Sequence, residues 1–165
     1  MSAARLALRV VGAAAGVVAL GSLAWADAPP GQYWPFDLRD VSIRDAKTGL
    51  RWQRYAAPPM GFGAAVSHCA ALSLDGFGAG AWRLPSYKEL LTLVDESPHT
   101  EYPTGAPVQI AIDGNAFPGV AVDAPYWTSS LYPPMSGYAY AVDFGTGAGQ
   151  DVAVASAIPY VRCVH

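Results

Sequence analysis

The sequence predicts an α+β domain in which two short helices pack on a small, mainly antiparallel sheet with long loops. Three observations predict this fold class. Apolar residues alternate with polar ones near the start and the end of the chain, and two segments between them have helical spacing. A stretch rich in Pro, Gly and Asp separates the helical segments from the last strands. Helices and strands that follow one another in blocks are typical of α+β proteins.

The first 26 residues are predicted to be a secretory signal peptide. Two arginines precede an uncharged apolar run from residue 10 to about 23, and the small residues Ala24 and Ala26 fit cleavage after Ala26. A membrane anchor is the alternative, but the run is shorter than the ~20 residues that span a bilayer. We therefore expect an extracytoplasmic mature chain, periplasmic or secreted, without stable membrane insertion.

The leader divides the chain into residues 1–26, an irregular proline-containing lead-in at 27–40, and a single domain at 41–165. Without the leader the chain keeps 8 of its 10 Lys and Arg residues and all 13 Asp and Glu residues, so its formal charge is −5. An acidic chain lacks the basic field that attracts nucleic acid. We therefore expect no nucleic-acid partner, and the same charge disfavours sulfated glycans as ligands.

Only two cysteines occur, Cys69 and Cys163. Disulfides persist outside the cytoplasm, and an even pair with no thiol left over indicates a single bridge. A reactive thiol and a metal ligand are the alternatives. His68 beside Cys69 is the feature that favours either of them, but adjacent residues on a helix do not face each other.

The first predicted elements are a β-hairpin and a helix. Residues 41–54 alternate around turn residues at 47–49, as the two strands of a hairpin do. From about 64 to 74, small and apolar residues that include Ala65 and Cys69 recur at helical spacing. This pattern places Cys69 on the buried face of the first helix.

The second helix has the clearest local signal. Ser86 and Glu89 form a capping box, in which each side chain satisfies a free backbone amide of the first helical turn. Apolar residues then share one face, so we expect a helix over about 87–95, which ends before Pro98. Residues 100–125 are predicted to be a long loop with little regular structure, and such loops often carry binding residues.

The last part of the chain is predicted to form strands. Large side chains alternate with small or polar ones over 138–144, as in a half-buried strand, and a glycine-rich turn leads into a further strand through 152–154. In the final segment Val161 and Cys163 share one face. The residues on the other face are Tyr160, Arg162 and Val164.

A series of motifs carries a resemblance to a known family. The chain contains, in this order, TGLRWQR, the helix cysteine Cys69, WRLPSYKELLTLVD, AFPG, YWTSS, AVDFGTG and YVRCVH. Over residues 41–165 this series resembles the C-terminal domain family of the Legionella collagen-like protein (Lcl). The resemblance implies a C-type-lectin-like fold with a bridge between the first helix and the last strand, hence Cys69–Cys163. It implies secreted or surface modules, some of them in adhesins, and no shared set of catalytic residues.

The candidate ligand-binding residues are Asp113, Asn115, Tyr126, Tyr132 and Tyr138. Asp113 and Asn115, with Asp123 nearby, suggest a calcium site, but calcium takes about six to eight oxygen ligands, and a glycine turn is the plainer interpretation. The tyrosines can stack on sugar rings or bury against a protein partner. Tyr132 is the one that we expect to be most exposed.

Other residue types indicate structure rather than chemistry. Trp82 and Trp127 are expected in the core, and Arg83 and Arg162 are expected to pair with carboxylates inside the fold. The histidines are dispersed without an HxxxH spacing, so we expect no metal and no cofactor. No serine lies within a G-x-S-x-G motif, so a hydrolase with a catalytic triad is improbable.

These observations favour a non-enzymatic binding module that contacts a glycan or a protein through loops between about 100 and 135. The main alternative is a structural or assembly domain that oligomerises within a cell-envelope complex. An uncharacterised hydrolase ranks below both.

Overall fold

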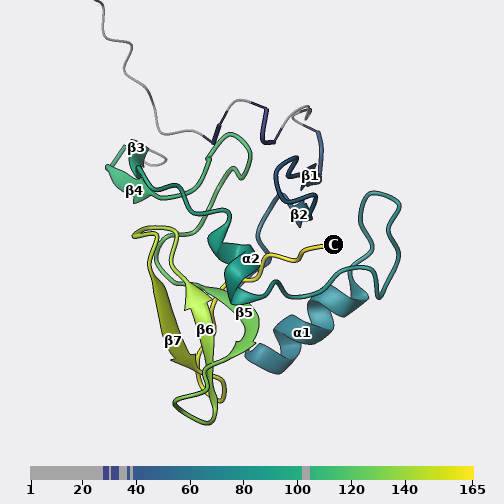
Figure 1. Ribbon diagram of the computed structural model, residues 1–165, viewed down its shortest axis with the longest axis vertical. Helices are drawn as coiled ribbons and strands as arrows, with labels where there is room; N and C mark the ends of the chain where they lie inside the picture. The colour runs from purple at the N-terminus through teal and green to yellow at the C-terminus, as the bar shows by residue number, and fades with distance from the viewer. Residues whose placement is uncertain (1–27, 30, 34–36, 38, 102–104) are drawn as a thin grey trace, which may run out of the picture.

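The computed structural model of the protein describes residues 28–29, 31–33, 37, 39–101 and 105–165, drawn in colour in Figure 1. The predicted signal peptide lies outside these residues. The described residues form two helices and short antiparallel sheets, which confirms the predicted α+β class. Within this part of the chain, neither helix has the length and apolar character that crossing a membrane requires.

The described elements follow one another as β1 (Ser42–Arg44), β2 (Arg51–Gln53), α1 (Phe62–Ala71), α2 (Tyr87–Leu91), β3 (His99–Glu101), β4 (Val108–Ile110), β5 (Tyr126–Leu131), β6 (Tyr138–Val142) and β7 (Gly149–Ala153). Strand β1 pairs with β2 and β3 with β4, while β5, β6 and β7 form a three-stranded sheet. Both helices contact β5, so this sheet is the centre around which they are arranged (Figure 1).

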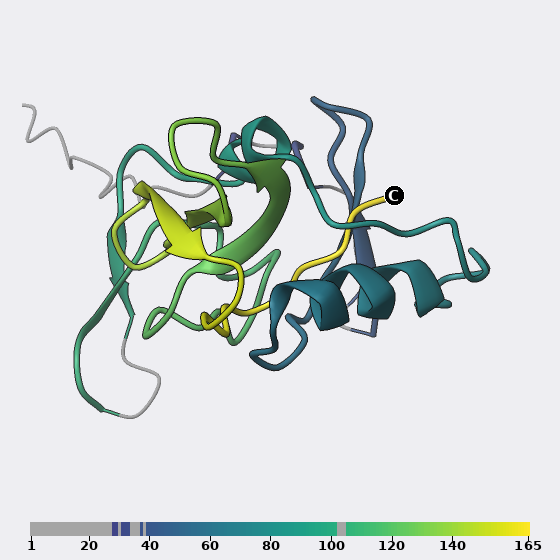
Figure 2. The ribbon, with the colours of Figure 1, turned by 90° about the horizontal axis from the view of Figure 1, so that it is seen from below.

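The C-terminal segment, residues 159–165, joins the first hairpin to the three-stranded sheet. The backbone N–H of Gln53 in β2 donates to the carbonyl of Cys163 (2.9 Å), and the N–H of Trp127 in β5 donates to the carbonyl of Tyr160 (2.9 Å). Figure 2 shows this segment, in yellow, passing between α1 and the β1–β2 hairpin. The end of the chain therefore supplies backbone pairing to two parts of the fold.

The core consists of two clusters of buried side chains. The first contains Trp52, Phe117 and Tyr126, and the second contains Trp82 and Trp127. Trp82 and Trp127 are fully buried, which confirms their predicted place in the core. Burial of large aromatic side chains is the main source of stabilisation in a domain of this size.

The disulfide between Cys69 and Cys163 is confirmed. It links α1 to the C-terminal segment with a Cα–Cα distance of 5.5 Å, and both residues are fully buried. Val161 and Cys163 pack in the second cluster, whereas Val164 packs in the first. The predicted alternation along the last residues therefore distributes their side chains between the two clusters.

Helix α1 is shifted toward the N-terminus from its predicted range, and helix α2 is shorter than predicted. Helix α1 begins at Phe62 and ends at Ala71, because Leu72 already has extended backbone angles. Helix α2 ends at Leu91 instead of continuing to residue 95. The amides of the next residues bond to carbonyls three positions back, which tightens the chain into turns and closes the helix early.

The loop with little regular structure that was predicted over 100–125 contains one short hairpin in its first part. Strands β3 and β4 pair, with His99 opposite Ile110 and Glu101 opposite Val108. Ile110 is buried in the first core cluster. Tertiary burial of this residue and pairing between the strands override the loop-like composition.

Arg83 and Arg162 differ in their partners. Arg83 forms the expected two-pronged ion pair with a carboxylate, that of Glu89, but at the surface rather than inside the fold, since the Arg83 side chain is 53% exposed. The expectation of a carboxylate partner for Arg162 was wrong: its Nη1 donates to the backbone carbonyls of Gln53 (2.8 Å) and Arg54 (2.6 Å). Arg162 is fully buried and lies 4.6 Å above the centre of the Phe117 ring.

The described part of the lead-in packs on the domain. Tyr33 belongs to the first core cluster and contacts Phe117 edge to face at 5.1 Å. The carbonyl of Gln32 accepts from the N–H of Ala46 (2.8 Å), and Arg54 Nη1 donates to the carbonyl of Asp37 (2.7 Å). These contacts hold the described part of the lead-in against the domain.

Candidate functional site

The two faces of strand β6 differ in how far they are covered. Alternate residues of a strand point to opposite faces, so Ala139 and Ala141 lie on one face of β6 and Tyr138 and Tyr140 on the other. The alanines are fully buried. The two tyrosines are half-buried, which leaves their face of the sheet accessible.

A set of four tyrosines forms this accessible surface, which we call the tyrosine face: Tyr87, Tyr132, Tyr138 and Tyr140. Tyr87 comes from α2 and stacks on Tyr140 with ring centres 4.5 Å apart and planes 15° from parallel. Tyr132, which follows β5, meets Tyr140 edge to face at 5.1 Å. All four are half-buried, so each keeps part of its ring or hydroxyl exposed.

Local structure holds Tyr87 in place. It is the first residue of α2, directly after the N-cap Ser86, and its backbone N–H donates to the Ser130 hydroxyl of β5 (3.0 Å). Its hydroxyl lies against Gly149 of β7, where a Cβ atom would overlap it. The absence of a side chain at Gly149 therefore makes room for Tyr87 on the sheet.

An acidic residue stands beside the tyrosines. Asp151 of β7 is paired directly with Tyr140 of β6, and directly paired residues point to the same face of a sheet. Asp151 is exposed. The surface therefore combines aromatic area, phenolic hydroxyls and one negative charge.

The sequence-predicted residues occupy three places. Tyr132 and Tyr138 belong to the tyrosine face. Tyr126 is fully buried in the first core cluster, where its hydroxyl accepts from the backbone N–H of Ala121 (2.9 Å). Burial raises the pKa of Tyr126 above its ordinary value. Tyr126 therefore supports the sheet from inside and is not available at the surface.

Asp113 and Asn115 shape a turn. Asp113 Oδ1 accepts from the backbone N–H groups of Asn115 (2.9 Å) and Ala116 (3.0 Å), and the carbonyl of Asn115 accepts from Arg54 Nη2 (3.2 Å). A carboxylate that bonds to the amides two and three residues ahead is a common turn device. Among the residues that the structure describes, no group of three or more His, Cys, Asp or Glu is placed to hold a metal ion.

Sequence reasoning missed Tyr87 as a member of the site. It recognised Tyr140 as one of several aromatic residues in this part of the chain but did not include it among the candidate ligand-binding residues. Tyr87 lies about fifty residues earlier, at the start of a helix, and no local signal connects it with β6. Its place follows only from the packing of α2 on the sheet.

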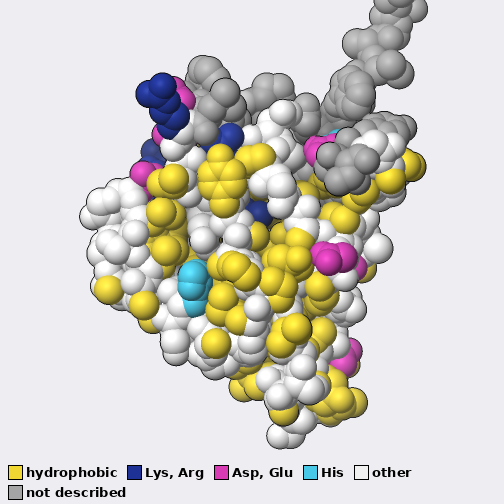
Figure 3. Space-filling view, turned by 180° about the vertical axis from the view of Figure 1, so that it is seen from behind, with side chains coloured by type: hydrophobic (Ala, Val, Ile, Leu, Met, Phe, Trp, Pro, Cys, Tyr) yellow, Lys and Arg dark blue, Asp and Glu magenta, His cyan; other side chains and the backbone are white. Residues whose placement is uncertain are grey.

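The end of the β5–β6 hairpin exposes apolar side chains. Leu131 and Met135 are 63% and 47% exposed, and Ile158, in the loop after β7, is 64% exposed. Residues 124–142 contain no charged side chain. Figure 3 shows the molecule from behind, with apolar surface and few charged groups toward the end where this hairpin lies.

The comparison with family models decides what kind of domain this is. The model of the Lcl C-terminal domain matches residues 41–165. The chain belongs to this family. The match covers every helix and strand described above, and it confirms the resemblance carried by the motifs. No curated protein matches the chain. For this Lcl C-terminal domain, the C-type-lectin-like arrangement stays a prediction, while the small α+β architecture and the disulfide are observed.

Proposed function

We propose that the protein is a non-enzymatic binding module that acts outside the cytoplasm and recognises a glycan or protein ligand through the tyrosine face. The observation that carries this proposal is the cluster of four half-buried tyrosines on the accessible side of the β5–β6–β7 sheet. Proteins seldom leave several aromatic side chains together at the surface unless the surface binds something.

The chemistry of the face suits sugar rings. An aromatic ring offers a flat apolar surface to the C–H groups of a sugar, and phenolic hydroxyls can exchange hydrogen bonds with sugar hydroxyls. Because Asp151 lies opposite Tyr140 and the mature chain is acidic, a neutral or cationic ligand fits better than an anionic one.

The extracytoplasmic location rests on the leader and the disulfide. The first 26 residues have the composition of a signal peptide cleaved near Ala26. A disulfide buried in the core supports the same compartment, since structural disulfides are rare in reducing compartments.

A structural or assembly role is the second candidate, and the exposed apolar residues of the β5–β6 end favour it. Leu131, Met135 and Ile158 would be covered if copies of the domain associated through this end. Such a domain would oligomerise in a cell-envelope complex without a separate ligand.

Binding of the exported, purified chain to a glycan array, followed by titration with the best ligand, tests the first candidate. We expect Tyr132→Ala and Tyr138→Ala each to weaken binding by about tenfold, because truncating a central interface aromatic typically costs more than about 1 kcal/mol. Gly149→Ala should also weaken binding, since the added methyl group displaces Tyr87. Tyr55→Ala is the matched control, because Tyr55 is 47% exposed and lies outside the face.

Loss of binding in the face variants with retention in Tyr55→Ala supports the proposal. A pull-down of envelope proteins with the same variants covers a protein ligand. If neither assay finds a ligand, and analytical ultracentrifugation shows an oligomer that Leu131→Ser dissociates, the assembly role replaces the binding role.

A further inference from the structure

Strand β7 forms an open edge of the β5–β6–β7 sheet. The opposite edge, β5, is covered by the C-terminal segment, because the N–H of Trp127 donates to the carbonyl of Tyr160 (2.9 Å). Figure 1 shows β7 as the outermost ribbon of the sheet, and its first three residues, Gly149, Gln150 and Asp151, are exposed. An exposed edge strand can pair with a further strand through its outward backbone groups.

The register of the sheet decides which backbone groups of β7 point outward. The N–H of Val154, directly after β7, donates to the carbonyl of Gly137, directly before β6 (2.9 Å). Bonded pairs alternate with non-bonded pairs along an antiparallel ladder, so the odd-numbered residues of β7 direct their backbone groups away from β6. In the described part of the chain, the outward groups of Gly149 and Asp151 have no hydrogen-bond partner. Both residues therefore offer a donor and an acceptor to another strand.

The side chains along this edge leave room beside one carboxylate. Asp151 points to the same face as Tyr140, with which it is paired, and the small residues Gly149 and Ala153 stand two positions to either side. The Tyr87 hydroxyl lies where a side chain at Gly149 would be, and it has no hydrogen-bond partner among the described residues. A residue opposite Gly149 on an added strand would meet this hydroxyl.

The charge at the edge is negative and is not balanced. Asp151 is exposed and belongs to no ion pair in the part of the chain that the structure describes. Residues 124–161, which include all three strands of the sheet, contain the carboxylates Asp143 and Asp151 and no Lys or Arg. Lys88, which follows Tyr87 in α2, forms no ion pair with Asp151. A basic side chain of a partner would supply the missing positive charge.

A second copy of the domain is a poor partner for β7. Antiparallel pairing of two β7 strands centred on Asp151 would place the two aspartates opposite each other, and like charges in that position destabilise a strand pair. Without the leader, each copy also has a formal charge of −5. The edge therefore disfavours self-association and favours a strand with a basic side chain.

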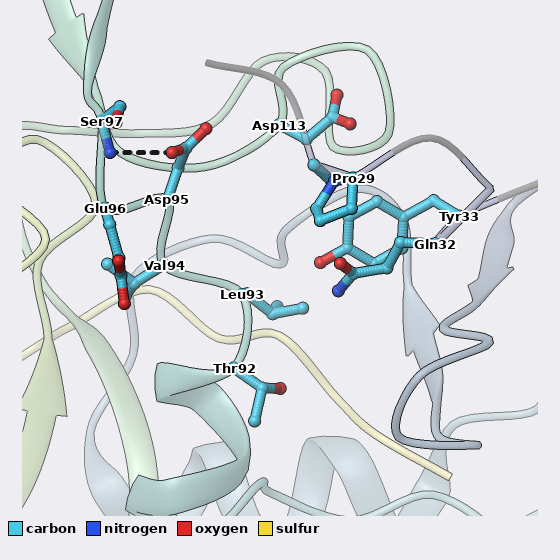
Figure 4. Close-up of a pocket in the computed structure, with 11 residues that line it drawn as sticks. Pro29, Gln32, Tyr33, Thr92, Leu93, Val94, Asp95, Glu96, Ser97 and Asp113 are labelled. Atoms are coloured by element: carbon cyan, nitrogen blue, oxygen red, sulfur yellow. Dashed lines mark hydrogen bonds between the residues drawn. The ribbon is translucent and has the colours of Figure 1, made fainter.

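The β7 edge is also separate from the cavity of the domain. A pocket of about 420 Å³ lies between the lead-in and the turns after α2 (Figure 4). Its lining includes Tyr33, Leu93 and Asp113, and none of its lining residues belongs to β7 or to the tyrosine face. Binding at the edge is thus contact along an open strand, which suits an extended chain rather than an enclosed small molecule.

We propose that β7 binds an extended peptide segment of another protein, which adds to the sheet as an antiparallel strand with a Lys or Arg opposite Asp151. Backbone hydrogen bonds with Gly149 and Asp151 provide the pairing, and the basic side chain provides the selectivity. The antiparallel direction gives the better hydrogen-bond geometry. This inference goes beyond the proposed function, because the contacts are backbone groups of β7 rather than the rings of Tyr132 and Tyr138.

NMR titration of the exported, purified and isotope-labelled chain with designed peptides tests the inference. The probe is the acetylated and amidated peptide STVKVTS, whose lysine is to lie opposite Asp151 and whose second threonine is to meet the Tyr87 hydroxyl. We expect saturable shifts of the amide signals of Gly149, Asp151 and Ala153. The peptide STVEVTS should bind about tenfold more weakly, because repulsion from Asp151 replaces attraction.

A second control removes a backbone hydrogen bond and keeps every side chain. The probe with an N-methylated lysine lacks the N–H that would donate to the Asp151 carbonyl. Since pairing depends on such bonds, we expect this peptide to bind about tenfold more weakly or not at all.

Charge reversal in the protein separates selective pairing from a general effect on folding. Asp151→Lys should reverse the preference, so that STVEVTS binds about tenfold more tightly than STVKVTS. Asp123→Lys is the matched control, because Asp123 is exposed and lies outside β7, and it should keep the wild-type preference.

Reversal of the charge preference together with weaker binding of the methylated peptide supports strand addition at β7. The inference is overturned if STVKVTS gives no saturable shifts at millimolar concentration, if both charged peptides bind equally, or if methylation has no effect. These results are independent of the tyrosine face. A glycan or protein ligand that Tyr132→Ala weakens keeps the proposed function even if the peptides fail, and peptide binding without such a ligand keeps the inference alone.

Discussion

Arg162 is a fully buried cation that the protein stabilises without a carboxylate. Burial lowers its pKa from the ordinary value, and its Nη1 is held by the carbonyls of Gln53 and Arg54. The guanidinium also lies over the Phe117 ring and interacts with the buried Tyr126 side chain. Ring contact and carbonyl bonds thus replace the expected ion pair, and they fix the C-terminal segment to the end of β2.

Replacing Arg162 should separate its packing contribution from its hydrogen bonds. We expect Arg162→Ala to lower the free energy of unfolding by about 3 to 5 kcal/mol, since it leaves a cavity and two carbonyls without donors. Arg162→Met keeps most of the volume and removes the buried charge, so its loss should be smaller, about 1 to 3 kcal/mol. Urea unfolding monitored by tryptophan fluorescence measures both.

The exposed Arg44→Ala is the matched control, and it should change stability by less than about 0.5 kcal/mol. If Arg162→Met is as destabilising as Arg162→Ala, the hydrogen bonds and charge of the guanidinium, and not the packing around Phe117, stabilise the segment.

At the scale of elements, the capping box of α2 shows what local sequence can specify. Ser86 and Glu89 bond reciprocally to each other's backbone amides, as their spacing predicts. Glu89 also accepts from both terminal nitrogens of Arg83. These contacts, the Arg83 hydrogen bonds first among them, lower the pKa of Glu89 to about 2.

The lowered pKa predicts a pH dependence of stability. The ordinary pKa of the group is 4.5 and the folded pKa is about 2, so the carboxylate stabilises the fold above pH 4.5. This contribution fades as pH falls from 4.5 toward 2. We expect Glu89→Gln to be less stable than the wild type at pH 7, with a difference that shrinks through this interval. Urea unfolding at a series of pH values measures it.

Asp123→Asn is the control for removal of an exposed carboxylate. A difference between wild type and Glu89→Gln that stays constant from pH 7 to pH 2 would mean that the side-chain amide fails as a cap for reasons other than charge.

The elements that sequence reasoning missed depend on distant contacts. Strands β3 and β4 have the composition of a loop, and pairing with burial of Ile110 turns them into a hairpin. The early end of α2 is similar, because the amide of Asp95 bonds to the carbonyl of Ala111 (2.9 Å), which draws the chain away from the helix axis. Neither contact has a signal within its own segment.

For the whole molecule, the disulfide closes a loop of 94 residues between α1 and the C-terminal segment. We expect the Cys69→Ala, Cys163→Ala double variant to lose about 4 to 5 kcal/mol of unfolding free energy, mainly because the unfolded chain is less constrained. Urea unfolding of the variant, and of the wild type with and without reductant, measures the loss.

Reduced wild type and double variant should agree within error, which serves as the control. Free thiols found by mass spectrometry of the unreduced, exported protein would contradict the bridge and with it the compartment argument.

The sequence by itself determined the fold class, the disulfide, the capping box and the core place of Trp82 and Trp127. Spacing, composition and burial preference predict the fold class, the capping box and the core residues, because these signals act within one segment of the chain. The disulfide is predicted because two cysteines allow only one pairing. Only the tertiary structure decided that Tyr87 stacks on Tyr140 and that Arg162 binds the carbonyls of Gln53 and Arg54. Each of these contacts joins segments far apart in the chain, and their meeting depends on how whole elements pack.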